Sequence, residues 1–243
     1  MADADWKPVN RSSTYELVID AIEERIIAGD LGVGDLLPAE RDLASKLGVS
    51  RASVREALRV LESLGVVRAS GGSGRGAGTF IAAMPTAALT RFLRLHVALT
   101  NFSLSDVIET RVQLEQSSAV LAATRADEDA LAVINAQLAI MDTPGVSLEA
   151  FNDADTAFHV AIAQAAGNQL FSDLTGAIRT SLRGPIFASF HQVDDPQELM
   201  SRLQAQHHQI MDAIIAGRTE EAAKVTEEHI RFATSELPGL TET

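Results

Sequence analysis

The chain has 243 residues, 46% of them hydrophobic, and a formal net charge of −13. This length accommodates one large domain or two ordinary ones, and the hydrophobic content is sufficient for packed cores. The absence of cysteine excludes disulfides, thiol catalysis and cysteine-ligated metal sites, so a metal here would need histidine and carboxylate ligands. No apolar run approaches the roughly 20 residues that cross a bilayer, and the acidic start of the chain is unlike a signal peptide. We therefore expect a cytoplasmic protein without a membrane partner.

The negative charge is unevenly distributed along the chain. Residues 1–82 carry a net charge of −2, whereas residues 83–243 carry −11. Within residues 36–82 the balance is +3, and most of the basic residues there are arginines. An acidic surface repels nucleic-acid phosphates, but this local basic segment is compatible with binding to them.

Three helices are predicted in the N-terminal third, over residues 14–28, 39–48 and 49–65. Gly48 suits a left-handed cap at the end of the second helix, and Ser50 is a good N-cap for the third. Apolar residues recur at helical spacing in the first helix, namely Leu17, Ile22 or Ala21, Ile26 and Ile27. Two short helices separated by a glycine-bearing turn predict a helix-turn-helix.

The third predicted helix has two different faces. Its apolar stripe consists of Val54, Ala57, Leu58, Leu61 and Leu64. On the other side Arg51, Arg55 and Arg59 recur at i, i+4 and i+8, so their guanidinium groups project along one face. The major groove of DNA admits a helix, and arginine reaches guanine edges or phosphates. The alternative is a solvated face on which these arginines pair with Glu56 and Glu62.

Residues 70–80, SGGSGRGAGTF, contain five glycines between two short β-prone runs. A phosphate-binding loop requires a lysine followed by Ser or Thr after the spaced glycine, and Ala77 and Gly78 stand there instead. A dinucleotide fingerprint requires a strand before the glycines, whereas a helix is predicted there. A hairpin with a glycine-rich turn, forming a wing after the third helix, fits the pattern better than a phosphate cradle or a plain linker.

The stretch LLPAERDLASKLGVSRASVREALRVLESLGVV, followed by GAGTFI, closely resembles the winged helix-turn-helix signature of the GntR superfamily of bacterial transcription regulators. The resemblance covers residues 14–82. It implies a DNA-binding domain of three helices and a hairpin wing. The resemblance implies DNA contacts from Arg41, Arg51 and Arg55 on the helices and from Gly72 in the wing. We also expect DNA contacts from the neighbouring residues Ser50, Ser53 and Arg75.

Helical periodicity dominates the rest of the chain and no strand pattern is convincing there. We expect a linker over residues 83–87, an all-α bundle over residues 88–235 and a tail over residues 236–243. Turn residues divide the bundle into six or seven helices, with breaks at residues 101–103, 143–145, 167–168, 184–185, 194–196 and 217.

Four separated polar residues of the bundle suggest a metal site. Asp155 and His159 are one helical turn apart, and further histidines follow at His207, His208 and His229. An aspartate with three histidines suits zinc, manganese or nickel. The alternative is that each histidine is an ordinary surface or capping residue.

The segments ETRVQLE, DADTAFH, QHHQIMDAI and EEHI resemble motifs of the FCD ligand-binding domain found in FadR-subfamily GntR proteins. This resemblance implies a divalent metal, most simply zinc, held by Asp155, His159, His207 and His229. It also implies effector contacts from Arg111 and Asn168. The alternatives are that Arg111 pairs with Glu115 at the surface and that Asn168 caps the next helix.

The whole chain is similar to the L-lactate-responsive (LldR-like) regulators of this family. The resemblance implies a homodimer that binds a short palindromic double-stranded operator, usually as a repressor, and is controlled by a small carboxylate such as L-lactate. Another organic or sugar acid is the alternative effector. A metal-dependent hydrolase is the alternative from another class, but it leaves the DNA-binding signature unexplained, so we expect no enzymatic activity.

Overall fold

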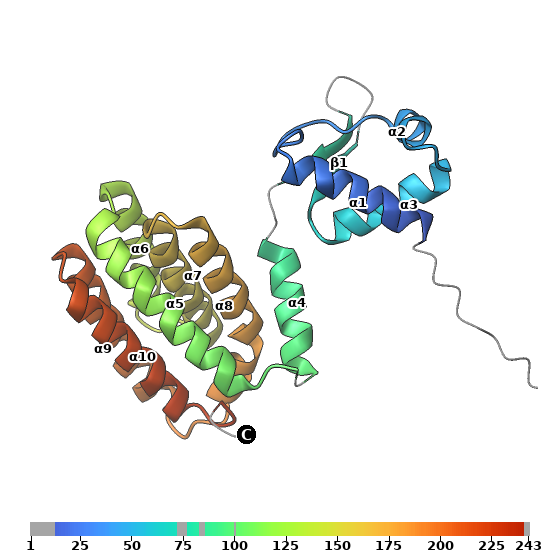
Figure 1. The fold of residues 1–243 in the computed structure, drawn as a ribbon. Coiled ribbons are helices and arrows are strands. Elements are labelled where there is room, and N and C mark those ends of the chain that lie inside the picture. The colour runs from blue at the N-terminus through green and yellow to red at the C-terminus, as the bar shows by residue number, and fades with distance from the viewer. Residues whose placement is uncertain (1–12, 72–76, 83–85, 100, 241–243) are drawn as a thin grey trace, which may run out of the picture. The chain divides into compact units, whose positions relative to one another are not determined.

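The computed structural model describes residues 13–71, 77–82, 86–99 and 101–240. The chain divides into two units, Met1–Ala88 and Leu89–Thr243. Ten helices and one two-stranded antiparallel sheet are present in the described residues (Figure 1). This confirms the predicted mainly α fold with a small hairpin. None of the helices in these ranges is both long and apolar enough to cross a bilayer.

The first unit begins with three helices, α1 (Thr14–Ile27), α2 (Glu40–Leu47) and α3 (Arg51–Ser63). Gly48 ends α2 in the left-handed conformation, with φ of 67°, which glycine adopts without steric cost. Ser50 caps α3 by accepting a hydrogen bond from the Ser53 amide at 3.1 Å. Both predicted caps are therefore confirmed, and they place α2 and α3 as a helix-turn-helix.

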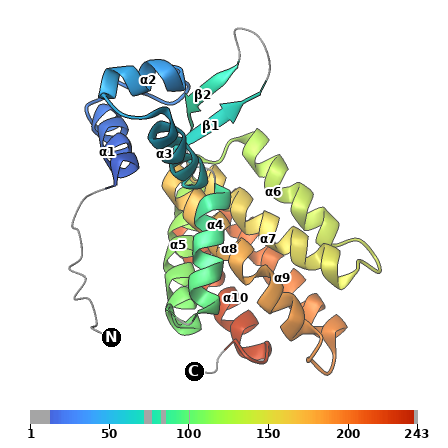
Figure 2. The ribbon, with the colours of Figure 1, turned by 90° about the vertical axis from the view of Figure 1, so that its right-hand side faces the viewer.

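The hairpin after α3 consists of β1 (Val67–Ser70) and β2 (Gly78–Ile81). The strands pair antiparallel with Val67 opposite Ile81, and Figure 2 shows them side by side next to α3. The predicted wing hairpin is thus confirmed. Gly72 and Arg75, which were assigned to the wing tip, lie outside the described residues.

The buried face of α1 differs in part from the predicted one, which is confirmed at Ile22 and at Ile26, a partly buried residue packed against the core. Val18 and Ile22 are buried, whereas Leu17 and Ile27 are 54% and 85% exposed. The expected pattern started one residue too early, because Val18 and Ile22 are the pair that lies one turn apart on the side facing the first unit's core. The predicted stripe of α3 is buried up to Leu61; Leu64 follows the last helical turn and is exposed.

Within the described residues, seven helices follow the hairpin, in agreement with the upper predicted number. They are α4 (Thr86–Ala98), α5 (Leu104–Arg125), α6 (Glu128–Met141), α7 (Leu148–Ala165), α8 (Gln169–Phe190), α9 (Pro196–Ile215) and α10 (Thr219–Glu236). Helix α5 packs against α7, α8, α9 and α10, and α7 also packs against α6 and α8. One continuous apolar core lies between these helices and includes Leu237 and Leu240 beyond the end of α10.

The predicted helix breaks are correct except at two places. The break at Gly184–Pro185 is wrong, because α8 runs through both residues. A proline removes one backbone hydrogen bond, and the remaining contacts of this long buried helix offset that loss. A break after Arg125 was missed, where Asp127 caps α6 by accepting from the Ala130 amide at 2.9 Å. The missed break compensates for the false one, so the number of helices is unchanged.

Candidate functional site

The outer face of α3 carries exposed arginines in the first unit. Arg51, Arg55 and Arg59 are all solvent-exposed, as the i, i+4 spacing predicts. The suggested pairing of these arginines with neighbouring glutamates of α3 is wrong for Arg55, which pairs instead with Glu40 at the start of α2. Arg41 is exposed beside it on α2. The helix-turn-helix therefore presents a row of cationic side chains to solvent.

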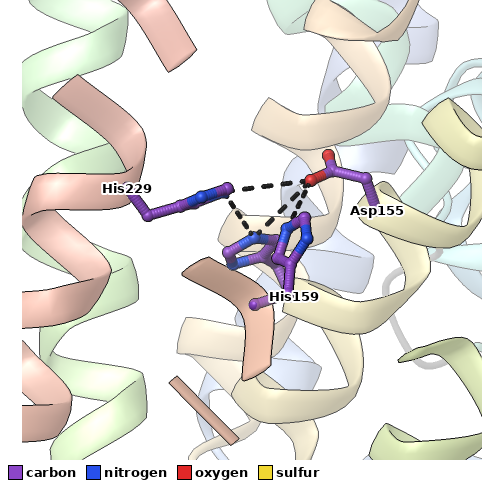
Figure 3. A group of neighbouring side chains, drawn as sticks. Asp155, His159 and His229 are labelled. Atoms are coloured by element: carbon purple, nitrogen blue, oxygen red, sulfur yellow. Dashed lines mark hydrogen bonds and ion pairs between the residues drawn. The ribbon is translucent and has the colours of Figure 1, made fainter. Parts of the chain in front are cut away.

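Three helices of the second unit bring the four predicted metal ligands together. Asp155 and His159 come from α7, His207 from α9 and His229 from α10, and one donor atom of each lies within 4.8 Å of the others. Figure 3 shows Asp155 and His159 directed toward His229. Asp155 Oδ1 lies 2.9 Å from His207 Nε2, 3.8 Å from His159 Nε2 and 3.9 Å from His229 Nε2. The reading of these histidines as unrelated surface residues is therefore wrong, since all three are buried.

Hydrogen bonds fix which nitrogen of two histidines carries the proton. His159 Nδ1 lies 2.8 Å from a Glu115 carboxylate oxygen, which only accepts, so this Nδ1 is the donor. His229 Nδ1 lies 3.0 Å from the side-chain oxygen of Gln206 and donates in the same way. The two Nε2 atoms therefore face each other across 3.3 Å with lone pairs and no shared proton. A cation placed between them removes this repulsion.

Burial keeps these two imidazoles neutral. Desolvation, reinforced by the nearby Arg179 charge, lowers the pKa of His159 from 6.5 to about 4. Burial and the neighbouring histidines hold the pKa of His229 well below its usual value. A neutral imidazole is the form that binds metal ions, so both side chains are ready to act as ligands near pH 7.

The donor set fits a divalent transition metal. Ligand atoms that lie about 2.0–2.2 Å from a common zinc ion are roughly 3–3.5 Å from each other. The separations measured from Asp155 Oδ1, between 2.9 and 3.9 Å, are close to that range. One carboxylate oxygen and three imidazole nitrogens suit zinc, manganese or nickel. His207 Nδ1 is buried without a hydrogen-bond partner in the described structure, and the ring packs edge-on against Phe158.

A cavity adjoins this cluster. Its polar lining includes Arg111, Asn152, Asp155 and His229, and the rest of its wall is mostly apolar and includes Leu237 and Leu240. Arg111 is 4% exposed and donates through Nε to Glu115 at 2.8 Å. The alternative of a surface pair is half correct, because the Arg111–Glu115 pair exists but is buried at the cavity.

Asn168 and His208 both lie outside the metal cluster and the cavity lining. Asn168 caps α8 by accepting from the Phe171 amide at 3.2 Å, and it does not line the cavity described above. Its effector contact stays a prediction, whereas Asn152 of α7, which the sequence analysis did not single out, does line the cavity. His208 is exposed and pairs with Asp142 at 3.0 Å, as expected for a residue that points away from the cluster.

Sequence reasoning missed two buried charged groups behind the ligands. Arg179 of α8 was not singled out, and Glu115 of α5 was considered only as a partner of Arg111. Arg179 contacts both Glu115 and Asp155 through hydrogen bonds of 2.6–2.8 Å. No local motif announces either role, because their burial arises only when five helices pack around the cluster.

Comparison with known proteins identifies the two domains of this chain. Residues 14–77 match the family described as bacterial regulatory proteins, gntR family, and residues 106–232 match the FCD domain. The Glc operon transcriptional activator of Escherichia coli strain K12 is 30% identical over 93% of this chain and 90% of its own length. A second protein of that strain, named provisionally as regulator of an L-lactate dehydrogenase operon, is 33% identical over 88% of this chain and 83% of its own. The solved structure of Streptococcus agalactiae GntR superposes with a TM-score of 0.64, at 25% identity, over 89% of this chain and 97% of that one.

Proposed function

Because the chain belongs to the gntR family of bacterial regulatory proteins and carries an FCD domain, we propose that a small carboxylate, bound beside a divalent metal ion, controls its affinity for DNA. The family assignment makes the protein a DNA-binding transcriptional regulator and not an enzyme. The observation that carries the proposal is the convergence of unprotonated ligand nitrogens next to a cavity that contains a buried arginine.

Charge balance supports an anionic effector. Arg111 and Arg179 bring two positive charges to the buried region, and Glu115 and Asp155 bring two negative ones. The buried groups described around the cluster are therefore neutral in sum before an ion binds. A divalent ion, most simply zinc, supplies two further positive charges and a Lewis-acidic centre for ligand oxygen atoms. An anion in the cavity offsets that excess.

Arg111 gives the effector site its selectivity for a carboxylate. Its Nε is engaged by Glu115, while the guanidinium lines the cavity. A guanidinium holds a carboxylate through two parallel hydrogen bonds, which a neutral or cationic ligand cannot match. We infer a hydroxycarboxylate such as L-lactate, supported by the name of the 33% identical relative. Another organic or sugar acid is the alternative.

Arg51 and Arg55 on the exposed face of α3 are proposed to read the operator, with Arg41, Ser50 and Ser53 beside them. A single recognition helix spans only a few base pairs, so a two-fold symmetric homodimer on a palindromic site doubles the contacts. Such a regulator acts in the cytoplasm, where the chromosome lies.

We further propose that the protein represses transcription and that the effector releases this repression. A transcription reporter, measured with and without effector, tests the proposal. Activation of the reporter by the regulator would contradict it.

One pair of measurements tests the proposed control. Elemental analysis of the purified protein is expected to find about one divalent metal ion per chain. In a thermal-shift assay, L-lactate is expected to raise the unfolding temperature, whereas lactamide, its uncharged analogue, has no effect, because only a ligand bound to the folded state stabilises it. Absence of metal from freshly purified protein and after zinc addition, or equal shifts with both compounds, overturns the proposal. A shift with gluconate alone supports the sugar-acid alternative.

A further inference from the structure

Arg179 is the most deeply placed charged side chain of the second unit. It is 1% exposed and lies on α8, which contributes none of the four candidate metal ligands. Its Nε and Nη2 donate to the two oxygens of Glu115 at 2.7 and 2.6 Å, and its Nη1 donates to Asp155 Oδ2 at 2.8 Å. A buried guanidinium is costly unless such partners surround it.

The two oxygens of Asp155 have different partners. Oδ2 accepts the hydrogen bond from Arg179, while Oδ1 faces the histidines and lies 2.9 Å from His207 Nε2. Rotation of the carboxylate toward the histidines would break the bond from Arg179. The contact therefore presents a single oxygen of Asp155 to the cluster.

Glu115, the other carboxylate that Arg179 contacts, also contacts the candidate ligand His159. Its Oε2 accepts both from Arg179 Nη2 and from His159 Nδ1, the latter at 2.8 Å. Its other oxygen, Oε1, accepts from Arg179 Nε at 2.7 Å and from Arg111 Nε at 2.8 Å, so two buried guanidinium groups hold the carboxylate in place. Because a carboxylate oxygen only accepts, the contact with Oε2 keeps the proton of His159 on Nδ1 and leaves Nε2 free for the cluster.

We propose that Arg179 and Glu115 are positioning residues of the metal centre, which fix Asp155 as a one-oxygen ligand and His159 as an Nε2 ligand. This inference rests on the proposed function only in that the cluster binds a divalent ion. With Asp155 restricted to one oxygen, the protein offers the metal ion four ligand atoms. An ion that prefers six ligands therefore has open coordination positions for the carboxylate of the effector. A purely structural role, in which the pair only ties α8 to α5, predicts no effect on the metal.

The substitution Arg179→Lys separates the two roles. Lysine keeps the charge but has no planar fork, so it cannot hold Glu115 at two atoms and Asp155 at a third simultaneously. The matched control is Arg183→Lys on the same helix, which alters an exposed ion pair with Asp153. Zinc affinity is measured by chelator competition on the full-length protein, and the visible absorption of the cobalt-substituted protein reports on the ligand geometry. Unfolding of the metal-free variants is measured in parallel.

We expect Arg179→Lys to weaken zinc binding by about 10–100-fold and to change the cobalt spectrum, while Arg183→Lys changes neither. A folded Arg179→Lys protein with wild-type affinity and spectrum overturns the inference. Glu115→Gln is measured in the same way, with the same expected direction. Nitrogen-15 NMR of histidines in the metal-free wild type needs no variant: a proton on Nδ1 of His159 supports the inference, and a proton on Nε2 overturns it. Failure of the wild type itself to bind zinc, cobalt, manganese or nickel would instead contradict the proposed function.

Discussion

Arg55 of α3 and Glu40 of α2 form a two-point ion pair across the helix-turn-helix. Arg55 Nε donates to Glu40 Oε1 at 3.3 Å, and its Nη2 donates to Oε2 at 2.9 Å. The hydrogen bond from Arg55 lowers the pKa of Glu40, so the pair is ionised near pH 7. The Arg55 side chain is still 51% exposed. The first residue of α2 therefore orients an arginine that remains accessible to DNA.

Replacement of Glu40 is expected to reduce specificity without reducing non-specific affinity. Glu40→Gln removes the charge that orients Arg55, and it also removes a negative charge that repels phosphates. Specific binding is measured by fluorescence anisotropy on an operator selected from random duplexes, and non-specific binding on scrambled DNA, both at fixed salt. The ratio of the two affinities is expected to fall a few-fold, because a partly exposed ion pair such as Arg55–Glu40 contributes at most about 1 kcal/mol.

Glu56→Gln is the matched control for Glu40, since Glu56 is an exposed residue of α3 and lies on the helix that carries Arg55. It removes the same charge and leaves the Glu40–Arg55 pair in place. An equal loss of specificity in both variants shows that total charge, and not the orientation of Arg55, is responsible.

Arg55→Ala is expected to weaken specific binding by about 1–3 kcal/mol and to relax the preference at one operator position, if Arg55 reads a base edge. Arg25→Ala, which removes an exposed arginine of α1 paired with Asp30, serves as control. Repeated selection with the variant measures the preference at each position. A uniform loss across all sequences would reassign Arg55 to the phosphates.

Arg111→Ala is expected to separate effector sensing from metal and DNA binding. Arg179 keeps Glu115 paired in this variant, so the metal ligands retain their support. The carboxylate loses a charged hydrogen-bond partner, worth about 1.5–3 kcal/mol, or roughly 10–150-fold in affinity. Calorimetry with L-lactate measures this loss. The same result would also argue against another class of function, an architectural DNA-binding protein whose C-terminal domain only dimerises. In such a protein, Arg111→Ala would have no response to L-lactate to abolish.

The metal-free protein is expected to lose stability as the pH falls from about 6.5 toward 4. The pKa of His159 is about 4 in the folded protein, against 6.5 for the model compound, because burial disfavours its charged form. Unfolding therefore takes up a proton in this window, and stability that is fully present above pH 6.5 declines on acidification. The slope for this single group reaches about 1.4 kcal/mol per pH unit. Burial lowers the pKa of His229 as well, so it acts in the same direction.

Urea unfolding with a chelator present, at pH 7.5 to 5, measures this slope. His159→Gln, which cannot take up the proton, is expected to show a flatter dependence between pH 6.5 and 5. Identical slopes in the wild type and the variant would contradict the origin assigned to it.

The local features of the fold were predictable because they depend on neighbouring residues. Gly48 and Ser50 announce a helix end and a helix start through backbone conformation and capping, both of which act within a few residues. The false break at Gly184–Pro185 shows the limit of such signals, because the packing of a long helix outweighs the local cost of a proline.

The four metal ligands were predictable from residue type and from resemblance to the FCD domain, whereas Arg179 was not. Arginine is most often exposed, and nothing in the local sequence around Arg179 distinguishes it. Its burial depends on Glu115, 64 residues away, and on Asp155, 24 residues away. Such partners become visible only after the helices are packed.

The wall formed by Leu237 and Leu240 has a practical consequence for handling the protein. Both residues follow Glu236, the last residue of α10, yet they are only 2% and 7% exposed. A variant cut back to Glu236 would keep the four candidate metal ligands but lose this part of the cavity wall. Protein prepared for ligand screens should therefore retain the segment that follows α10.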